Sequence, residues 1–175
     1  FDRALEINPN DFASWYNKGK LFRDLKRPID ALFAYDRVLD LIPNLSRALL
    51  GKGNALCDLE RYEESIAYFD QAISIDPNDF AALYNKACSL EKLQRYEETI
   101  QILNHALALN PNSADAWNNK GSALQKLKRH EEAILAFDQA LTIAPADSVA
   151  WFNRGLALEC LKCYEQANES YDRAL

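Results

Sequence analysis

Hydrophobic and small residues recur at intervals of three and four along most of the chain, which is the spacing of one face of an α-helix. The clearest example lies between Ala114 and Asp147, where a polar break at Lys128–His130 separates two such segments. Pro145 closes the second segment, because proline has no N–H to donate and disfavours helix in the residue before it. The pattern therefore predicts a helix, a turn, a second helix and a loop that contains the proline.

This two-helix unit recurs along the chain with a constant period. Five of the six prolines are evenly spaced: Pro9, Pro43, Pro77, Pro111 and Pro145. Residues 1–11 are predicted to be the end of a preceding unit's second helix. The predicted units that follow are 12–45, 46–79, 80–113, 114–147 and a truncated fifth unit at 148–175. A period of this length indicates a row of similar units, each of which contacts mainly its neighbours.

The small and aromatic residues of the unit have fixed places. In the clearest copy these are Trp117, Gly121, Leu124, Ala133, Phe137, Ala140 and Pro145. Gly121 and Ala133 lack bulk, so the two helix axes can approach to the short end of the usual ~8–10 Å spacing. At these residues the unit resembles the tetratricopeptide repeat, whose W-x2-L-G-x2-Y…A-x3-F…P pattern has the same period. The resemblance implies an all-α fold, a right-handed superhelical solenoid of helix-turn-helix tetratricopeptide repeats.

Composition and charge exclude several classes of protein. The net charge of −6 argues against general nucleic-acid binding, which needs a basic stripe. No run of ~18 apolar residues is present, so no membrane span is predicted. Four cysteines (Cys57, Cys88, Cys160 and Cys163) do not follow the repeat, which makes a reducing cytoplasm the simplest compartment. The chain opens on Phe1 and contains no methionine, so we expect it to be a piece of a longer protein.

The sequence contains no recognisable catalytic constellation. Its two histidines, His105 and His130, belong to different units, and His130 takes the place that tyrosine has in other units. Cys160 and Cys163 form a single C-x-x-C pair, whereas a structural zinc site needs four ligands. We therefore predict no enzyme activity, no metal and no cofactor.

The family resemblance implies that the first helices line a concave groove that binds a peptide. The candidate groove residues are Tyr16, Asn17, Lys20, Asn54, Tyr84, Asn85, Asn118, Asn119, Phe152 and Asn153. Four of these asparagines (17, 85, 119 and 153) share one place in the repeat, and only Gly51 breaks the series. A side-chain amide both donates and accepts, so a row of amides can satisfy an extended peptide backbone. This row resembles the asparagine ladder of the O-GlcNAc transferase family. The alternative is that asparagine is merely tolerated on an exposed helix face.

A series of basic residues precedes the small residue of each first helix: Lys18, Lys52, Lys86, Lys120 and Arg154. One interpretation is a ladder of charges for an acidic partner. The other, which nearby acids and the negative net charge favour, is that the long stems pack between neighbouring repeats while the charged heads reach water.

The predicted function is a protein-interaction scaffold that binds a protein or an extended peptide in the groove, without nucleic acid or membrane. A second interpretation is the recruiting segment of an enzyme whose catalytic domain lies outside these residues. A third is head-to-tail self-association through exposed repeat faces. Asn168 stands where other units have leucine or isoleucine, so we expect the fifth unit to lie near the end of the array.

Overall fold

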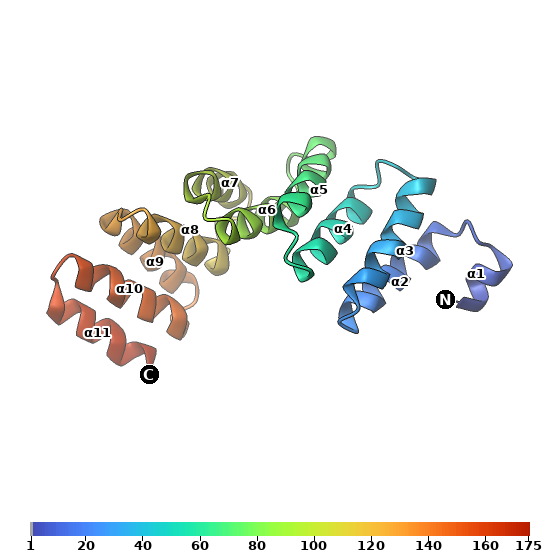
Figure 1. Cartoon of the computed structure of the whole chain (residues 1–175). Helices are drawn as coiled ribbons and strands as arrows, with labels where there is room; N and C mark the ends of the chain where they lie inside the picture. Colours follow the sequence, from blue (N-terminus) through green and yellow to red (C-terminus); the bar gives the residue numbers. More distant parts are fainter. Residues whose placement is uncertain (1) are drawn as a thin grey trace. The chain divides into compact units, whose positions relative to one another are not determined.

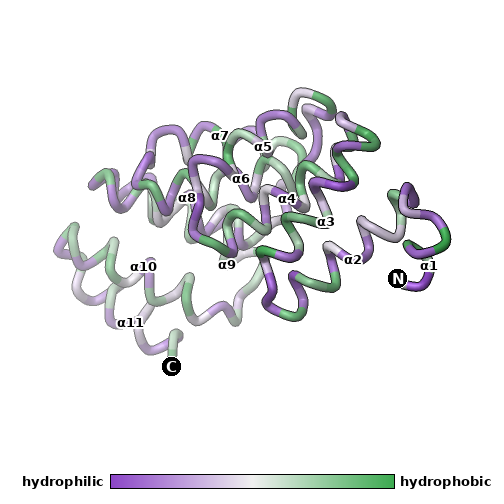
Figure 2. Tube along the Cα trace, turned by 45° about the vertical axis from the view of Figure 1, so that its right-hand side comes forward, coloured by the Kyte–Doolittle hydropathy of each residue, from purple (hydrophilic) through white to green (hydrophobic). Residues whose placement is uncertain are grey.

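The computed structural model describes residues 2–175, and over that range its regular elements are all helices, which confirms the predicted all-α fold. The chain divides into two compact units, one up to Leu93 and one from Gln94 (Figure 1). Hydrophobic and hydrophilic residues alternate along the helices (Figure 2), as expected of helices that bury one face.

The first unit contains six helices, in which each helix packs against the next along the chain from α2 to α6. Their bounds are α1 Asp2–Ile7, α2 Phe12–Asp24, α3 Pro28–Leu41, α4 Ser46–Asp58, α5 Tyr62–Ile75 and α6 Phe80–Lys92. The first helices of successive repeats are also in contact, α2 with α4 and α4 with α6. The second helices therefore lie on one side of a row of first helices.

The second unit repeats this arrangement with five helices. Their bounds are α7 Tyr96–Leu109, α8 Ala114–Lys126, α9 His130–Ile143, α10 Ser148–Cys160 and α11 Tyr164–Ala174. Each helix packs against the next, and the first helices α8 and α10 touch directly.

Most helix hairpins close on a glycine that faces an aromatic ring. A Cβ added at Gly121 would lie 2.5 Å from Cε1 of Phe137, a ring that is fully buried. Gly53 meets the ring of Phe69 in the same way, again at 2.5 Å. The helix backbones approach closely because the first helix has no side chain at this point, as the sequence predicted.

The turn inside each hairpin contains a residue in the left-handed conformation that is not glycine. These residues are Lys26, Glu60, Gln94, Lys128 and Lys162, with φ between 57° and 62°. In the first turn the N–H of Arg27 donates to the carbonyl of Phe22, and the N–H of Lys26 donates to that of Arg23. This is the pair of bonds that ends a helix in a Schellman motif, so the turn satisfies carbonyls that the helix end leaves open.

The loops between hairpins are held by three kinds of polar contact. A tryptophan of the following helix donates to the proline carbonyl, as from Trp117 Nε1 to Pro111 O at 2.9 Å. An aspartate or serine caps the helix, as Asp79 accepts from the N–H of Ala82. An Asn or Asp at the loop start accepts from the N–H two residues later, as at Asn8, Asp76 and Asn110. The loop at residues 42–45 has none of these, because Ile42, Leu45 and Leu49 occupy the three places.

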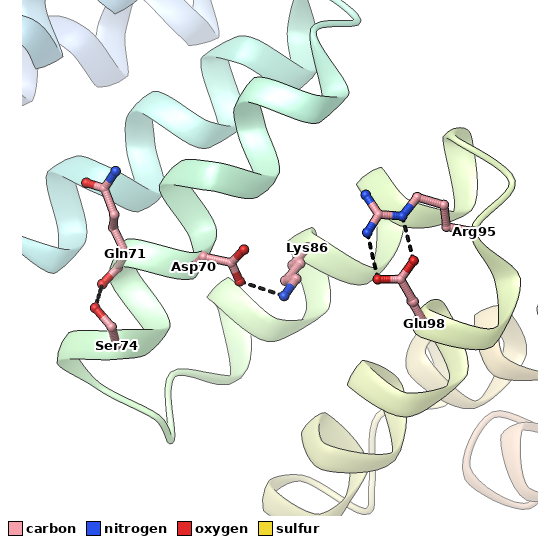
Figure 3. Close-up of polar contacts among 6 residues, drawn as sticks. All are labelled: Asp70, Gln71, Ser74, Lys86, Arg95 and Glu98. Carbon is pink, nitrogen blue, oxygen red and sulfur yellow. Dashed lines mark hydrogen bonds and ion pairs between the residues drawn. The ribbon is translucent and has the colours of Figure 1, made fainter.

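An arginine before the second helix pairs with an acid three residues later. Arg95 donates through Nε and Nη2 to Glu98 at 2.7 and 2.6 Å (Figure 3). The same bidentate bond joins Arg61 to Glu64, and it holds the pKa of that carboxyl below its usual value. These glutamates lie in the first turn of a helix, where the helix dipole favours negative charge, and each is also bound to a neighbouring cation.

Candidate functional site

In the first unit, six of the predicted groove residues lie on the first helices α2, α4 and α6. Tyr16, Asn54, Tyr84 and Asn85 are half-buried, whereas Asn17 and Lys20 are exposed. Nδ2 of Asn85 donates to Oδ1 of Asn54 at 2.8 Å, which joins α6 to α4. The structure therefore brings these two amides together, although they occupy different places in the repeat.

The aromatic candidates of this unit pack against neighbouring side chains of the first helices. The Arg47 guanidinium lies over the ring of Tyr16, 5.0 Å from its centroid. The ring of Tyr84 stacks on Phe80 with centroids 5.9 Å apart. Each aromatic residue is thus held in place while part of its surface stays accessible.

An ion pair joins α2 to α4 on the same helices. Nε of Arg23 donates to Oδ2 of Asp58 at 2.8 Å, and both side chains are about one-third exposed. The two residues are 35 apart, one more than the repeat period, so the available signal was an opposite charge one place further along the adjacent first helix.

The absence of asparagine at Gly51 has a packing cause. A Cβ at Gly51 would lie 2.6 Å from Cε1 and Cζ of Tyr35, whose ring also covers Gly19. The tyrosine therefore requires glycine in both first helices that it touches. The gap in the asparagine series follows from packing at Tyr35.

In the second unit, the four remaining candidates lie on α8 and α10. Asn118, Asn119 and Asn153 are half-buried, and Phe152 is 50% exposed. Nδ2 of Asn153 donates to Oδ1 of Asn118 at 3.3 Å, so a second amide pair joins adjacent first helices. Phe152 lines an apolar cavity with neighbours that include Val149 and Tyr171.

A cavity of about 380 Å³ with a mixed polar and apolar lining lies beside Asn153 of this amide pair. Its lining residues include Ser122, Gln125, His130 and Asn153. Nδ1 of His130 is buried and has no hydrogen-bond partner among the described residues. From the sequence, His130 was expected only to substitute for a structural tyrosine, whereas the structure adds it to the wall of a cavity. The substitution itself, shortly after Lys126 and Lys128 in the chain, was the available signal.

Most of the basic series is bound to aspartates of the preceding second helix. Nζ of Lys86 lies 2.5 Å from Asp70 (Figure 3), and Nε of Arg154 lies 2.6 Å from Asp138. Lys52 forms the same pair with Asp36. Three of the five basic side chains therefore connect neighbouring hairpins. Each aspartate precedes its partner by the same interval along the chain, and that constant interval was a signal in the sequence.

None of the four cysteines forms a disulfide in the described part of the chain. Burial raises the pKa of the Cys88 thiol to about 11, so it is protonated at neutral pH. Cys160 and Cys163 are exposed. Within residues 2–175, no cluster of His, Cys, Asp or Glu side chains could hold a metal ion, and no helix is long and apolar enough to span a membrane.

Comparison with protein families gives three matches, each to a tetratricopeptide repeat. The matched residues are 1–33, 46–79 and 84–148. No curated protein matches the chain.

Among solved structures, the chain is similar to the crystal structure of MamA protein, with 25% identity and a TM-score of 0.87 over 94% of this chain and 90% of that chain. It is also similar to YrrB, described as a TPR protein with an unusual peptide-binding site. That match has 26% identity and a TM-score of 0.83 over 99% of this chain and 89% of that chain. A MamA segment from Desulfovibrio magneticus RS-1 has 24% identity and a TM-score of 0.82 over 90% and 93% of the two chains, and shows the fold alone.

Proposed function

Since the chain belongs to the tetratricopeptide repeat family, we propose that it is a non-catalytic interaction scaffold whose first helices bind an extended peptide. The fold and its neighbours support a protein-interaction scaffold in general. The finer proposal is that the amides of the first helices bind the peptide backbone, while aromatic residues select its side chains.

The observation that carries this proposal is the pairing of amides across adjacent first helices. Asn85 bonds to Asn54 in the first unit, and Asn153 bonds to Asn118 in the second. Each bond uses one of the two N–H groups of the donor and one lone pair of the acceptor, so both amides keep further capacity. Both side chains of each pair are half-buried, and the hydrogen bond between them fixes their orientation. It therefore offers oriented donors and acceptors at a smaller entropic cost than free side chains would.

The side chains around each pair can select the peptide's own side chains. Tyr16 and Phe152 offer accessible aromatic surface, which often contributes most to binding energy. In the second unit the cavity next to Asn153 is lined by His130, Lys126 and Lys128, and the buried Nδ1 of His130 has no hydrogen-bond partner within residues 2–175. A buried polar atom without a partner is unfavourable, so rotation of the His130 ring that brings Nδ1 to a ligand group in the cavity would add affinity. YrrB, with its described peptide-binding site, lends support from a similar fold.

The test is to select linear peptides from a random display library on the whole chain and to measure their dissociation constants by calorimetry. Asn85→Ala and Asn153→Ala should each weaken a selected peptide about fivefold to thirtyfold, which corresponds to ~1–2 kcal/mol for lost hydrogen bonds. Asn168→Ala, on an exposed position of the second helix α11, is the matched control and should leave affinity unchanged.

A second measurement isolates contacts to the peptide backbone. Methylating backbone nitrogens of the selected peptide removes donors without changing its side chains. We expect methylation at alternate residues to weaken binding. Equal affinity for the methylated peptide, together with unchanged affinity in both alanine variants, would contradict the proposal.

A further inference from the structure

The basic residue before the small residue of each first helix has a fixed environment in three of the repeats. Lys52, Lys86 and Arg154 each bind an aspartate at the same place on the preceding second helix. Lys52 has a second partner, because its Nζ lies over the ring of Tyr68 at 4.3 Å. These side chains are thus partly buried but electrostatically satisfied.

Lys120 occupies the same place on α8, and both of these partners are replaced. Asn104 stands at the position where the other three repeats have the aspartate. Ala136 stands where Tyr68 stands two periods earlier. Among the described residues Lys120 forms no ion pair, and its Nζ lies instead over the ring of Trp117 at 4.9 Å.

The missing tyrosine leaves space. A cavity of about 400 Å³ lies between α8 and α9, and its lining includes Trp117, Lys120, Leu135, Ala136 and Gln139. Leu135 is 66% exposed, so an apolar wall stands open beside the lysine. The cavity combines one cation with aromatic and aliphatic surface.

The nearest charges do not neutralise the lysine. Glu132 also lines the cavity, but its two carboxylate oxygens are held by Arg129 Nε and Nη2, both at 2.6 Å. Burial lowers the pKa of Lys120, Glu132 offsets this only in part, and Arg129 lowers it further. By contrast, burial also lowers the pKa of Lys52, but hydrogen bonds to Asp36 and Tyr68 outweigh it and the pKa is raised. A half-buried cation without its carboxylate gains most from an added negative group.

This cavity is distinct from the proposed peptide site on the first helices. At 100° per residue, Lys120 and Asn118 lie ~160° apart around α8. Trp117, Lys120 and Leu124 share one stripe of the helix, because they are spaced by three and four residues.

We propose that the cavity beside Lys120 is a second docking site, which takes an aspartate or glutamate side chain of a partner polypeptide together with an adjacent aliphatic residue. The carboxylate replaces the aspartate that is absent at Asn104, and the aliphatic side chain packs on Trp117, Leu135 and Ala136. Complementarity of charge and of apolar surface selects this occupant.

The test uses a defined peptide, acetyl-GELELG-amide, and its neutral counterpart acetyl-GQLQLG-amide. Binding is followed by ¹⁵N NMR through the indole N–H of Trp117. The indoles of Trp15 and Trp151 donate to equivalent proline carbonyls and serve as internal references. We expect a saturable shift of the Trp117 signal with the acidic peptide and a dissociation constant at least tenfold weaker for the neutral one.

Two variants restore the partners that Lys52 has in the second repeat, an aspartate and a tyrosine. Asn104→Asp supplies the missing partner of Lys120 and should lower the affinity for the acidic peptide at least tenfold without loss of helix content. Ala136→Tyr fills the cavity and should also lower the affinity for the acidic peptide at least tenfold. Asn168→Asp adds an identical charge on another exposed second-helix position and should leave the affinity within twofold of the original.

Three outcomes would overturn the proposal. The first is equal binding of the neutral peptide, or a Trp117 signal that does not move. The second is unchanged affinity in Asn104→Asp, which keeps the test decisive even where Ala136→Tyr does not fold. The third is an equal shift with acetate alone at matched concentration, because the aliphatic contact would then contribute nothing.

Discussion

Substitution of Gly121 by alanine tests the packing on which most of the hairpins depend. The added Cβ would lie 2.5 Å from Phe137 Cε1, about 1 Å closer than the 3.4–4 Å of ordinary contact. The ring is 0% exposed and lies among other buried residues, which limit its movement. Overpacking of this kind costs ~1–3 kcal/mol, while alanine gains ~1 kcal/mol of helix propensity over glycine. We expect a net loss of about 1 kcal/mol, which lowers the melting temperature by ~2–4 °C.

The chain offers its own control for this substitution. In the third repeat the two places are taken by Ala87 and Leu103, both fully buried. In a Phe137→Leu background the clash is absent, so alanine at 121 should stabilise by ~0.5–1 kcal/mol. The effect of Gly121→Ala on the free energy of unfolding should thus change sign between the original chain and the Phe137→Leu background. The resulting coupling energy lies within the range seen for residues in contact.

The assay is thermal and guanidinium denaturation of all four variants, followed by far-UV circular dichroism. Whole transitions are compared, because repeat arrays need not unfold in two states. If alanine stabilises the chain in both backgrounds, or destabilises both equally, the glycine is not required by the aromatic ring and the reasoning fails.

Three further predictions concern single side chains. Leu45→Asp supplies the cap that α4 lacks and should stabilise the chain by ~1 kcal/mol in the same denaturation assay, whereas Leu45→Ala should not. The hydrogen bond from Arg61 lowers the pKa of Glu64 below 4.5, so its contribution to stability is present above pH 4.5 and is lost as the pH falls through the lowered value. A carboxyl titration by ¹³C NMR should show this, and Arg61→Gln should return the pKa towards 4.5. The Cys88 thiol, with a pKa of about 11, should react with iodoacetamide at pH 8 more slowly than the exposed Cys160, as read by mass spectrometry, and equal rates would contradict its burial.

Helix content and hairpin packing could be predicted from the sequence because they repeat. The glycine and aromatic places of a hairpin, such as Gly121 and Phe137, recur at a fixed period and carry the close approach of two helices. The prolines indicated the helix ends for a similar local reason, since their effect on the backbone does not depend on distant residues.

The site was less predictable, because its contacts depend on which rotamers meet across two helices. Asn85 bonds to Asn54, 31 residues earlier, whereas Asn153 bonds to Asn118, 35 residues earlier. No single period gives both pairs. The role of Gly51 was also hidden, since it depends on the ring of Tyr35 from the preceding second helix.

The left-handed conformation of the turn residues could not be predicted from their residue types. Lysine, glutamate and glutamine fill this conformation here, although glycine and asparagine are the residues that favour it. The recurring helix-ending hydrogen bonds impose the conformation, so it follows from the two helices and not from the residue itself.

The loop at residues 42–45 has a consequence for how the first unit can move. Without a capping carboxylate, a tryptophan bond or an Asn at its start, it depends mainly on backbone contacts such as Leu45 N–H to Ile42 O at 3.3 Å. Segments with few such restraints open at the lowest free-energy cost. Local opening there, together with loss of the Arg23–Asp58 and Lys52–Asp36 ion pairs, would let α2 and α3 shift while α4 to α6 stay in register. The first unit could then bind a bulky ligand by displacement of Tyr16 and Asn17 on α2, while the Asn54–Asn85 pair on α4 and α6 keeps its position.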